Sequence, residues 1–215
     1  SCLVGSEMCI RDRWCCDLIV RQLGLQSYLP IYQAMSLFTE QRCVNTQDEL
    51  WVLQHRPVFT LGKAGKISHL LQESAIPLVR TDRGGQITYH GPGQLVIYTL
   101  IDFQRRGISV RALIERLEQA IVVVLKMHGM FGETFVERPG VYIQGKKIAS
   151  LGLRIRKGGV YHGLSINVDM DLSPFSLINP CGYADLEMTQ MKQWEPNVSI
   201  KKVAQDMVQS LEAIV

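Results

Sequence analysis

The 215-residue chain has no run of eighteen or more apolar residues, so a membrane-spanning helix is not expected. Its six cysteines, at positions 2, 9, 15, 16, 43 and 181, include no CxxC pair and no spacing that recurs as a zinc site would require. Neither a structural metal nor a secreted disulfide scaffold is therefore indicated. This cysteine usage favours a reduced protein of the cytoplasm.

Strong charge and a phosphate-binding loop are also missing. The net charge is only +3, which is too mild for a dedicated nucleic-acid binder. No segment matches GxxxxGK[ST], so no nucleotide phosphate loop is predicted. Basic residues do gather at 105–106, 146–147 and 154–157. Each group is either a solvated face or part of a local surface for an acidic protein partner.

The chain is long and apolar enough, at 47% hydrophobic residues, to bury one sizeable core. It has no internal repeat and no low-complexity linker. The first thirteen residues, SCLVGSEMCIRDR, follow neither the helical nor the strand period and lack the apolar core of a signal peptide. We expect residues 1–13 to be a non-native leader and residues 14–215 to form a single domain.

Alternating apolar residues predict strands at 17–24, 76–80, 86–89 and 95–101, and helical spacing predicts helices at 28–42, from Ser109 to Gly129, and from Ser199 onward. Segment 50–63, broken at Pro57, predicts a strand pair or one strand with an edge irregularity. Segment 140–170 predicts three short antiparallel strands. The fold class is therefore α+β, with a mixed, largely antiparallel sheet flanked by helices.

A glycine-rich segment, RGGQITYHGPGQ, spans residues 83–94 and otherwise looks like a strand. Its glycines are Gly84, Gly85, Gly91 and Gly93. An interior glycine costs a strand roughly 0.5–1 kcal/mol, which makes sense where a ligand lies against the backbone. Bulges and a tight turn in an ordinary sheet explain the same pattern.

Cys181 lies in NPCGYAD, between a proline that restricts the backbone and a glycine that permits unusual torsions. A short loop of this kind can present a thiol at a surface, although a lone cysteine is more often a buried apolar residue. The thiolate is the reactive form, and an unperturbed thiol has a pKa of about 8.5. A reactive Cys181 therefore needs an activating neighbour.

Lys147 is the first candidate for that neighbour, because it lies in the otherwise apolar alternation of GKKIASLGLR. An ammonium ~4 Å from the sulfur would attract it by about 4 kcal/mol at an effective dielectric of 20. Lys146 takes the inward place if the strand register slips by one. His90 and His162 are either proton shuttles or structural histidines.

Other polar residues are more ambiguous. Arg83 and Arg154 either meet an acidic group or serve as scaffold donors and surface charges. Asp169 and Asp171 indicate a turn rather than a metal pair, because no further oxygen ligands follow at calcium-loop spacing.

Taken together, RGGQITYHGPGQ, GKKIASLGLRIRKGGVYHGLSINV and NPCGYADLEM resemble the lipoyl(octanoyl) transferase family, whose members make protein-bound lipoate. The resemblance runs from about Asp17 to the C-terminus. It implies a fold similar to the catalytic domains of biotin and lipoate ligases. It also implies acyl transfer from octanoyl-acyl carrier protein, through a cysteine thioester, to a lysine of a lipoyl domain.

By the same resemblance, Cys181 is the acyl-thioester nucleophile and Lys147 the residue that activates it. The implied acyl-substrate contacts are Arg83, Gly84, Gly85, Gln86, Ile87, Thr88, Tyr89, His90, Ser150, Leu151, Gly152, Gly163, Leu164 and Ser165. No metal and no cofactor is implied, because exchange between thioesters is nearly isoenergetic and amide formation from a thioester is downhill.

The partners implied by the resemblance are acyl carrier protein, the lipoyl domains of 2-oxoacid dehydrogenase complexes and the glycine cleavage H protein. Nucleic acid and membranes are not expected partners, and the chain is expected to be a monomer. Two alternatives with the same fold remain. One is an ATP-dependent lipoate or biotin ligase, which does not need the cysteine, and the other is a non-catalytic acyl-binding protein.

Overall fold

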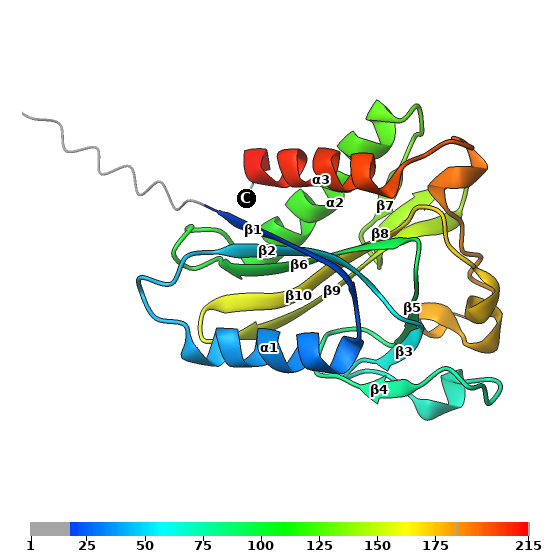
Figure 1. Cartoon of the computed structure of the whole chain (residues 1–215), viewed down its shortest axis with the longest axis horizontal. Coiled ribbons are helices and arrows are strands. Elements are labelled where there is room, and N and C mark those ends of the chain that lie inside the picture. Colours follow the sequence, from blue (N-terminus) through cyan, green and yellow to red (C-terminus); the bar gives the residue numbers. More distant parts are fainter. Residues whose placement is uncertain (1–17, 184, 215) are drawn as a thin grey trace, which may run out of the picture.

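The computed structural model describes residues 18–183 and 185–214, so the predicted leader at 1–13 lies outside the described residues. A seven-stranded sheet with the order β1-β2-β6-β10-β9-β8-β7 forms its centre (Figure 1). The strands are β1 (Ile19–Gln26), β2 (Glu49–His55), β6 (Gln94–Asp102), β7 (Glu133–Phe135), β8 (Arg138–Ile143), β9 (Lys146–Arg156) and β10 (Gly159–Asn167). Among the described strands of this sheet, only β1 and β2 pair in parallel. The mixed, largely antiparallel sheet predicted from the sequence is confirmed.

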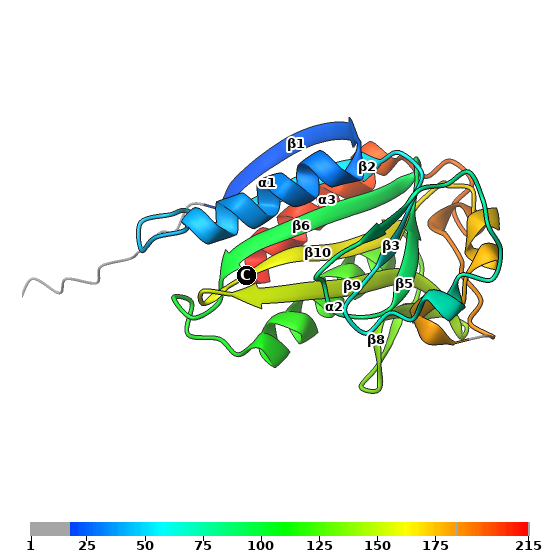
Figure 2. The same cartoon turned by 90° about the horizontal axis from the view of Figure 1, so that it is seen from below.

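Three helices cover the two faces of this sheet. Helices α2 (Val110–Met127) and α3 (Ile200–Ile214) lie on one face, and α1 (Tyr28–Gln41) lies on the other (Figures 1 and 2). The predicted ends of α2 are confirmed. The Ser109 side chain accepts a hydrogen bond from the Ala112 backbone N–H at 3.1 Å, and Gly129 just beyond the helix has φ +74°.

Each face has its own apolar core. Between α2, α3 and the sheet, the helices bury Leu113, Leu117, Ile121, Val203, Met207 and Leu211. On the other face, Tyr28 and Met35 of α1 pack with Trp51, Tyr98 and Tyr161 of the sheet. Burying one such side chain contributes roughly 1.5–3 kcal/mol. Within residues 18–183 and 185–214, no helix is both long and apolar enough to span a membrane.

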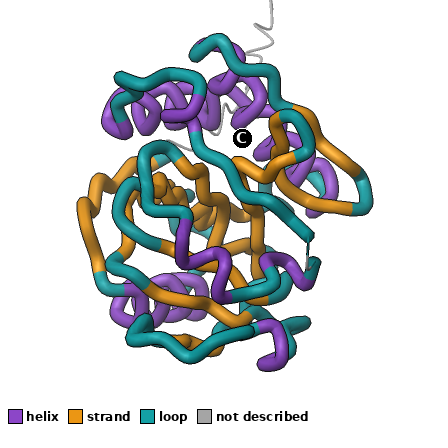
Figure 3. The backbone as a smooth tube through the Cα atoms, turned by 90° about the vertical axis from the view of Figure 1, so that its right-hand side faces the viewer, coloured by secondary structure: helices purple, strands orange, loops and turns teal. Residues whose placement is uncertain are grey.

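A second, smaller sheet has the order β4-β3-β5 and consists of β3 (Val58–Leu61), β4 (Leu78–Arg80) and β5 (Ile87–His90). The expectation that segment 50–63 forms a strand pair or one irregular strand is wrong, because β2 belongs to the large sheet and β3 to the small one. Pro57, which has no N–H to donate to a ladder, lies where the chain crosses between them. Figure 3 shows helices on both sides of the strands.

The small sheet packs against short 3₁₀ segments late in the chain. These are η2 (Ser173–Leu177) and η3 (Pro180–Gly182). Two further 3₁₀ segments are η1 (Ile67–His69), between β3 and β4 in the sequence, and η4 (Met191–Gln193), after η3. Phe59, Tyr89 and Phe175 form an aromatic cluster, with ring centroids 5.5–5.6 Å apart. This packing fixes the segment that carries Cys181 beside the small sheet.

A fully buried carboxylate, Asp48, holds three arginines at the end of the large sheet opposite this segment. Its oxygens accept from Arg42 at 2.8 Å and from Arg105 and Arg106 at 2.7 Å each. The Asp102 backbone N–H adds a fourth hydrogen bond at 2.9 Å. These partners hold the pKa of Asp48 below its usual range despite burial. The basic pair at 105–106 is therefore largely committed to the fold rather than free for a partner.

Replacing Asp48 by Ala should destabilise the protein by about 3–5 kcal/mol, because one buried and two partly buried guanidinium groups would lose their shared carboxylate. Chemical denaturation at neutral pH measures this change. Glu115→Ala is the control, since Glu115 pairs with Arg111 at an exposed site and should contribute less than about 0.5 kcal/mol. Equal effects of the two substitutions would contradict this account of Asp48.

Candidate active site

Cys181 is presented by a strained turn. It lies in η3 with φ +56°, in the left-handed region, and Gly182 follows with φ +81°. Such a conformation costs a residue other than glycine on the order of 1 kcal/mol and is common at functional sites. The turn is anchored by hydrogen bonds from Gly182 N–H to Asn179 C=O and from Asn179 N–H to His69 C=O. The thiol is thus partly buried but not packed away in the core.

Lys147 on β9 faces this thiol. Its Nζ lies 3.2 Å from Cys181 Sγ and donates to Pro139 C=O at 2.8 Å. The side chain is buried, whereas Lys146 is exposed and forms an ion pair with Glu187. The alternative register with Lys146 inward is therefore wrong.

Backbone pairing brings these two residues together across 34 positions of sequence. Lys147 N–H donates to Glu187 C=O at 2.8 Å, and Thr189 N–H donates to Lys147 C=O at 2.9 Å. The segment that follows Cys181 therefore runs beside the start of β9, as a parallel bridge between Lys147 and Met188. The turn carrying Cys181 is held next to Lys147 by this short ladder.

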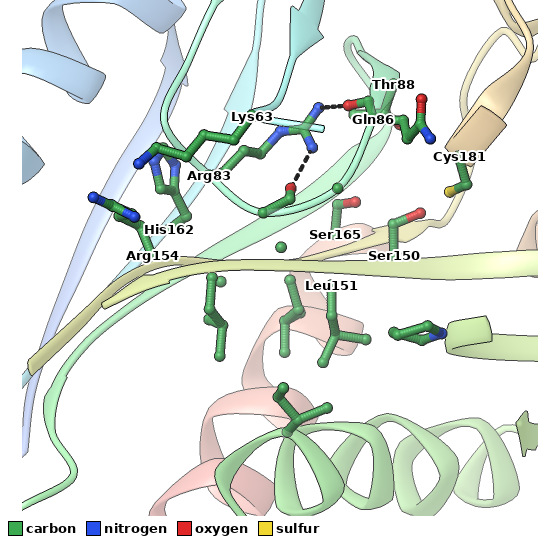
Figure 4. Close-up of a pocket in the computed structure, with 18 of the residues that line it drawn as sticks. Lys63, Arg83, Gln86, Thr88, Ser150, Leu151, Arg154, His162, Ser165 and Cys181 are labelled. Atoms are coloured by element: carbon green, nitrogen blue, oxygen red, sulfur yellow. Dashed lines mark hydrogen bonds between the residues drawn. The ribbon is translucent and has the colours of Figure 1, made fainter. Parts of the chain in front are cut away.

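A cavity of about 470 Å³ extends from these two residues. Figure 4 shows Cys181 at one end, Arg154 and His162 at the other, and Arg83 between them. Of the substrate contacts that the sequence predicts, those on its lining are Arg83, Gly84, Gly85, Gln86, Ile87, Thr88, His90, Ser150, Leu151, Gly152, Gly163, Leu164 and Ser165. Tyr89 is the exception, because it alternates to the opposite face of β5 and packs against Phe59 and Phe175.

The four glycines of the segment at 83–94 divide into two kinds. Gly84 and Gly85 line the cavity, and Gly84 N–H donates to Leu153 C=O of β9 at 2.9 Å. Gly91 and Gly93 do not line it. A Cβ at Gly91 would lie 2.3 Å from the Tyr89 hydroxyl, and one at Gly93, which has φ +85°, would lie 1.8 Å from a backbone oxygen. Close packing, rather than the approach of a ligand, therefore explains why these two positions are glycine.

Arg83 shapes the cavity wall from within. Its guanidinium is buried and donates to Thr60 C=O and Gln86 C=O at 2.7 Å each and to Gly84 C=O at 2.9 Å. Burial lowers its pKa. Arg83 is therefore a scaffold donor rather than a partner of an acidic group, as the sequence left open. Its aliphatic stem and its loop form part of the cavity wall.

The two candidate histidines have partners other than the thiol. His90 Nδ1 contacts Gln94 Oε1 at 2.7 Å, and burial lowers the pKa of His90 to about 3. His162 Nε2 contacts Asp82 at 3.1 Å, and burial lowers its pKa as well. Among the described residues, neither ring contacts Cys181, whereas Lys147 Nζ does.

At the far end of the cavity, sequence reasoning named Arg154 and His162 as candidates but missed Asp82 and Tyr161. Asp82, Arg154 and His162 meet there, with Tyr161 donating a hydrogen bond to Asp82. The sequence gives little indication of a role for Asp82, because it is one carboxylate in a predicted loop with no motif around it. His162 has φ +61° inside a strand, a torsion that only the structure reveals.

The remaining charged residues have structural partners. Arg154 lies 3.6 Å from Asp82, and Arg156 pairs with Glu40 at 2.7 Å, so the basic group at 154–157 is not a free cationic surface. Asp169 pairs with Lys192 at 2.9 Å, and Asp171 accepts from Ser173, as the predicted turn requires. Over the part of the chain that is described, no cluster of three metal-binding side chains occurs.

The fully buried His55 should make stability depend on pH. Burial lowers the pKa of His55 to about 4, so stability present above pH ~6.5 is lost as the pH falls from there toward 4. Between pH 7 and pH 5 we expect His55 to lower the free energy of unfolding by on the order of 1–2 kcal/mol. Denaturation curves of wild type and His55→Gln at both pH values test this, and an equal drop in the two proteins would contradict it.

Comparison with known proteins agrees with this geometry. Residues 32–212 match the family model of the lipoyl protein ligase A/B catalytic domain. The chain is 56% identical to an octanoyltransferase of Chromobacterium violaceum over 90% of this chain and 94% of that protein. It is 52% identical to an octanoyltransferase of Klebsiella pneumoniae over 92% of each.

Solved structures show the same fold at low identity. A putative lipoate protein ligase from Thermoplasma acidophilum with bound lipoic acid has a TM-score of 0.70 at 17% identity, covering 91% of this chain and 85% of that one. A biotin protein ligase from Aquifex aeolicus has a TM-score of 0.53 at 13% identity, covering 91% and 67%. The predicted likeness to both kinds of ligase is thus confirmed, and the chain belongs to the octanoyltransferases of the lipoyl protein ligase A/B family.

Proposed function

We propose that this protein moves an octanoyl group from octanoyl-acyl carrier protein to a lysine of a lipoyl domain, through a thioester on Cys181. The observation that carries the proposal is the 3.2 Å contact between Lys147 Nζ and Cys181 Sγ at the end of the cavity. A buried ammonium beside a sulfur favours the thiolate, which is the nucleophilic form.

In the first step, the Cys181 thiolate attacks the carbonyl carbon of the donor thioester. A new carbon–sulfur bond forms, and the bond to the donor sulfur breaks. The Lys147 ammonium gives its proton to the departing thiolate, so the donor leaves as a neutral thiol. The enzyme then holds the octanoyl group on Cys181, with Lys147 as a neutral amine.

In the second step, the neutral amine of the acceptor lysine attacks the enzyme thioester. The carbon–nitrogen bond forms, and Cys181 leaves as a thiolate. Lys147, having lost its proton in the first step, takes the proton that the acceptor nitrogen must lose. The product is an amide, and the ammonium and thiolate are restored together for the next cycle.

The cavity is the proposed site of the octanoyl tail. Burying about seven CH₂ and CH₃ groups at ~0.8 kcal/mol each supplies roughly 5–6 kcal/mol of binding. The proposed tail contacts come from the lining of β9 and β10, namely Ser150, Leu151, Gly152, Gly163, Leu164 and Ser165. Because Gly84 and Gly85 have no side chains, the acyl chain can lie directly against the backbone of this part of the wall.

We propose acyl carrier protein as the donor, and the lipoyl domains of 2-oxoacid dehydrogenase complexes and the glycine cleavage H protein as acceptors. The protein is proposed to act as a monomer, because one chain supplies both Cys181 and Lys147. The cytoplasm is the proposed compartment, since the reaction needs a free thiol and reducing conditions keep thiols free.

Cys181→Ser should abolish the acyl adduct and reduce octanoyl transfer by about three orders of magnitude or more, because a hydroxyl is not ionised by this neighbour. The measurement is intact-protein mass after incubation with octanoyl-acyl carrier protein in the absence of ATP. Cys43→Ser is the matched control, since Cys43 is an exposed thiol remote from the cavity lining. Failure of wild type to form an adduct without ATP would favour a ligase instead.

Lys147→Ala should raise the pH at which Cys181 is alkylated, because the sulfur loses its only ammonium contact among the described residues. A thiol-alkylating probe, with the Cys181 peptide followed by mass spectrometry, gives the profile. Lys146→Ala removes the same charge one residue away and should leave it unchanged. If both variants behave like wild type, Lys147 does not activate the thiol.

A further inference from the structure

The peptide bond between Pro139 and Gly140 lies between the site and helix α2. Its carbonyl accepts from Lys147 Nζ at 2.8 Å, and its N–H donates to Glu118 Oε1 at 2.8 Å. The C=O and N–H of a trans peptide point in opposite directions. Glu118 and Lys147 therefore hold one peptide unit from its two sides.

Glu118 does not line the cavity, although Ile114 one helical turn earlier does. It is half-buried, and burial raises its pKa, while the Gly140 N–H and the positive charge of Lys147 oppose that rise. Carboxylate, peptide dipole, ammonium and sulfur are thus aligned in alternating sign. Hydrogen bonds arranged in series in this way reinforce one another.

The peptide is packed tightly against Lys147. Gly140 has φ +127°, and a Cβ there would lie 2.6 Å from Lys147 Cε. Within the described residues, the ammonium donates to two acceptors only, Pro139 C=O and Cys181 Sγ, with the Tyr142 ring 5.4 Å away. Since one of the two acceptors is this carbonyl, the orientation of the peptide decides where Nζ lies.

We propose that Glu118 is a positioning residue, which holds Lys147 against Cys181 through the Pro139–Gly140 peptide. The inference rests on the proposed activation of Cys181 by Lys147. Without the Glu118 carboxylate, the peptide loses the acceptor for its N–H and is free to turn its carbonyl away from Lys147. The ammonium then follows its acceptor and spends less time on the sulfur.

The other ionisable groups that face this pair are Tyr142 and Arg138 on β8 and Arg83 on the cavity wall. None of them contacts the N–H of Gly140. Glu118 also acts on Lys147 directly through its charge, and Glu118→Gln, which removes the charge but keeps an acceptor oxygen, separates that effect from the route through the peptide.

The test is the pH profile of Cys181 alkylation in three variants, followed at the Cys181 peptide. Glu118→Ala should move the profile to higher pH and slow alkylation at neutral pH by up to about tenfold. Glu118→Gln keeps a side-chain oxygen for the Gly140 N–H and should recover more than half of that shift. Glu115→Ala removes a carboxylate from the same helix, at an exposed position, and should match wild type.

Two results would overturn the proposal. One is an alkylation profile of Glu118→Ala that is identical to that of wild type, whether or not the variant melts at a lower temperature. Glu118 would then have at most a structural role. The other is a Glu118→Gln profile no better than that of Glu118→Ala, which would remove the hydrogen bond as the route. Because alkylation needs no acyl substrate, both are read independently of octanoyl transfer. Lys147→Ala run alongside shows whether the activation itself has failed.

Discussion

A buried ammonium 3.2 Å from a sulfur atom is the interaction on which the rest of this site depends. At an effective dielectric near 20, opposite charges at that separation attract by about 5 kcal/mol. A lysine without a counter-charge is costly to bury, and so is a thiolate. In the proposed ammonium–thiolate pair, each charge offsets the burial cost of the other while the two atoms remain in contact.

The fold keeps this contact by restraining both partners. Lys147 lies in the buried first part of β9, a long strand of the large sheet, where neighbouring strands fix its direction. Cys181 lies on a turn that is tied to the small sheet on one side and, through residues 187–189, to Lys147 itself on the other. A turn with left-handed torsions at two successive residues is stable here because these ties hold it from both ends.

Strong local patterns predicted most of the secondary structure. The apolar stripe and the caps of α2, and the alternation through residues 140–170, depend on neighbours in sequence, so they are readable without a fold. The fate of segment 50–63 was not readable, because a proline break does not say whether the next strand joins the same sheet. Likewise the role of Tyr89, predicted to contact substrate, depends on which face of β5 borders the cavity, and alternation alone does not choose the face.

The sequence by itself determined the chemistry available: a cysteine between proline and glycine, a lysine in an apolar strand, and glycines where backbone is exposed. Only the tertiary structure decided which of these residues meet, because contacts across 34 positions arise from strand pairing and packing rather than from local preference. It selected Lys147 over Lys146, directed both histidines to other partners, and assigned Gly91 and Gly93 to packing. It also placed Asp82 and Glu118, whose surroundings no local pattern encodes, beside the groups that they contact.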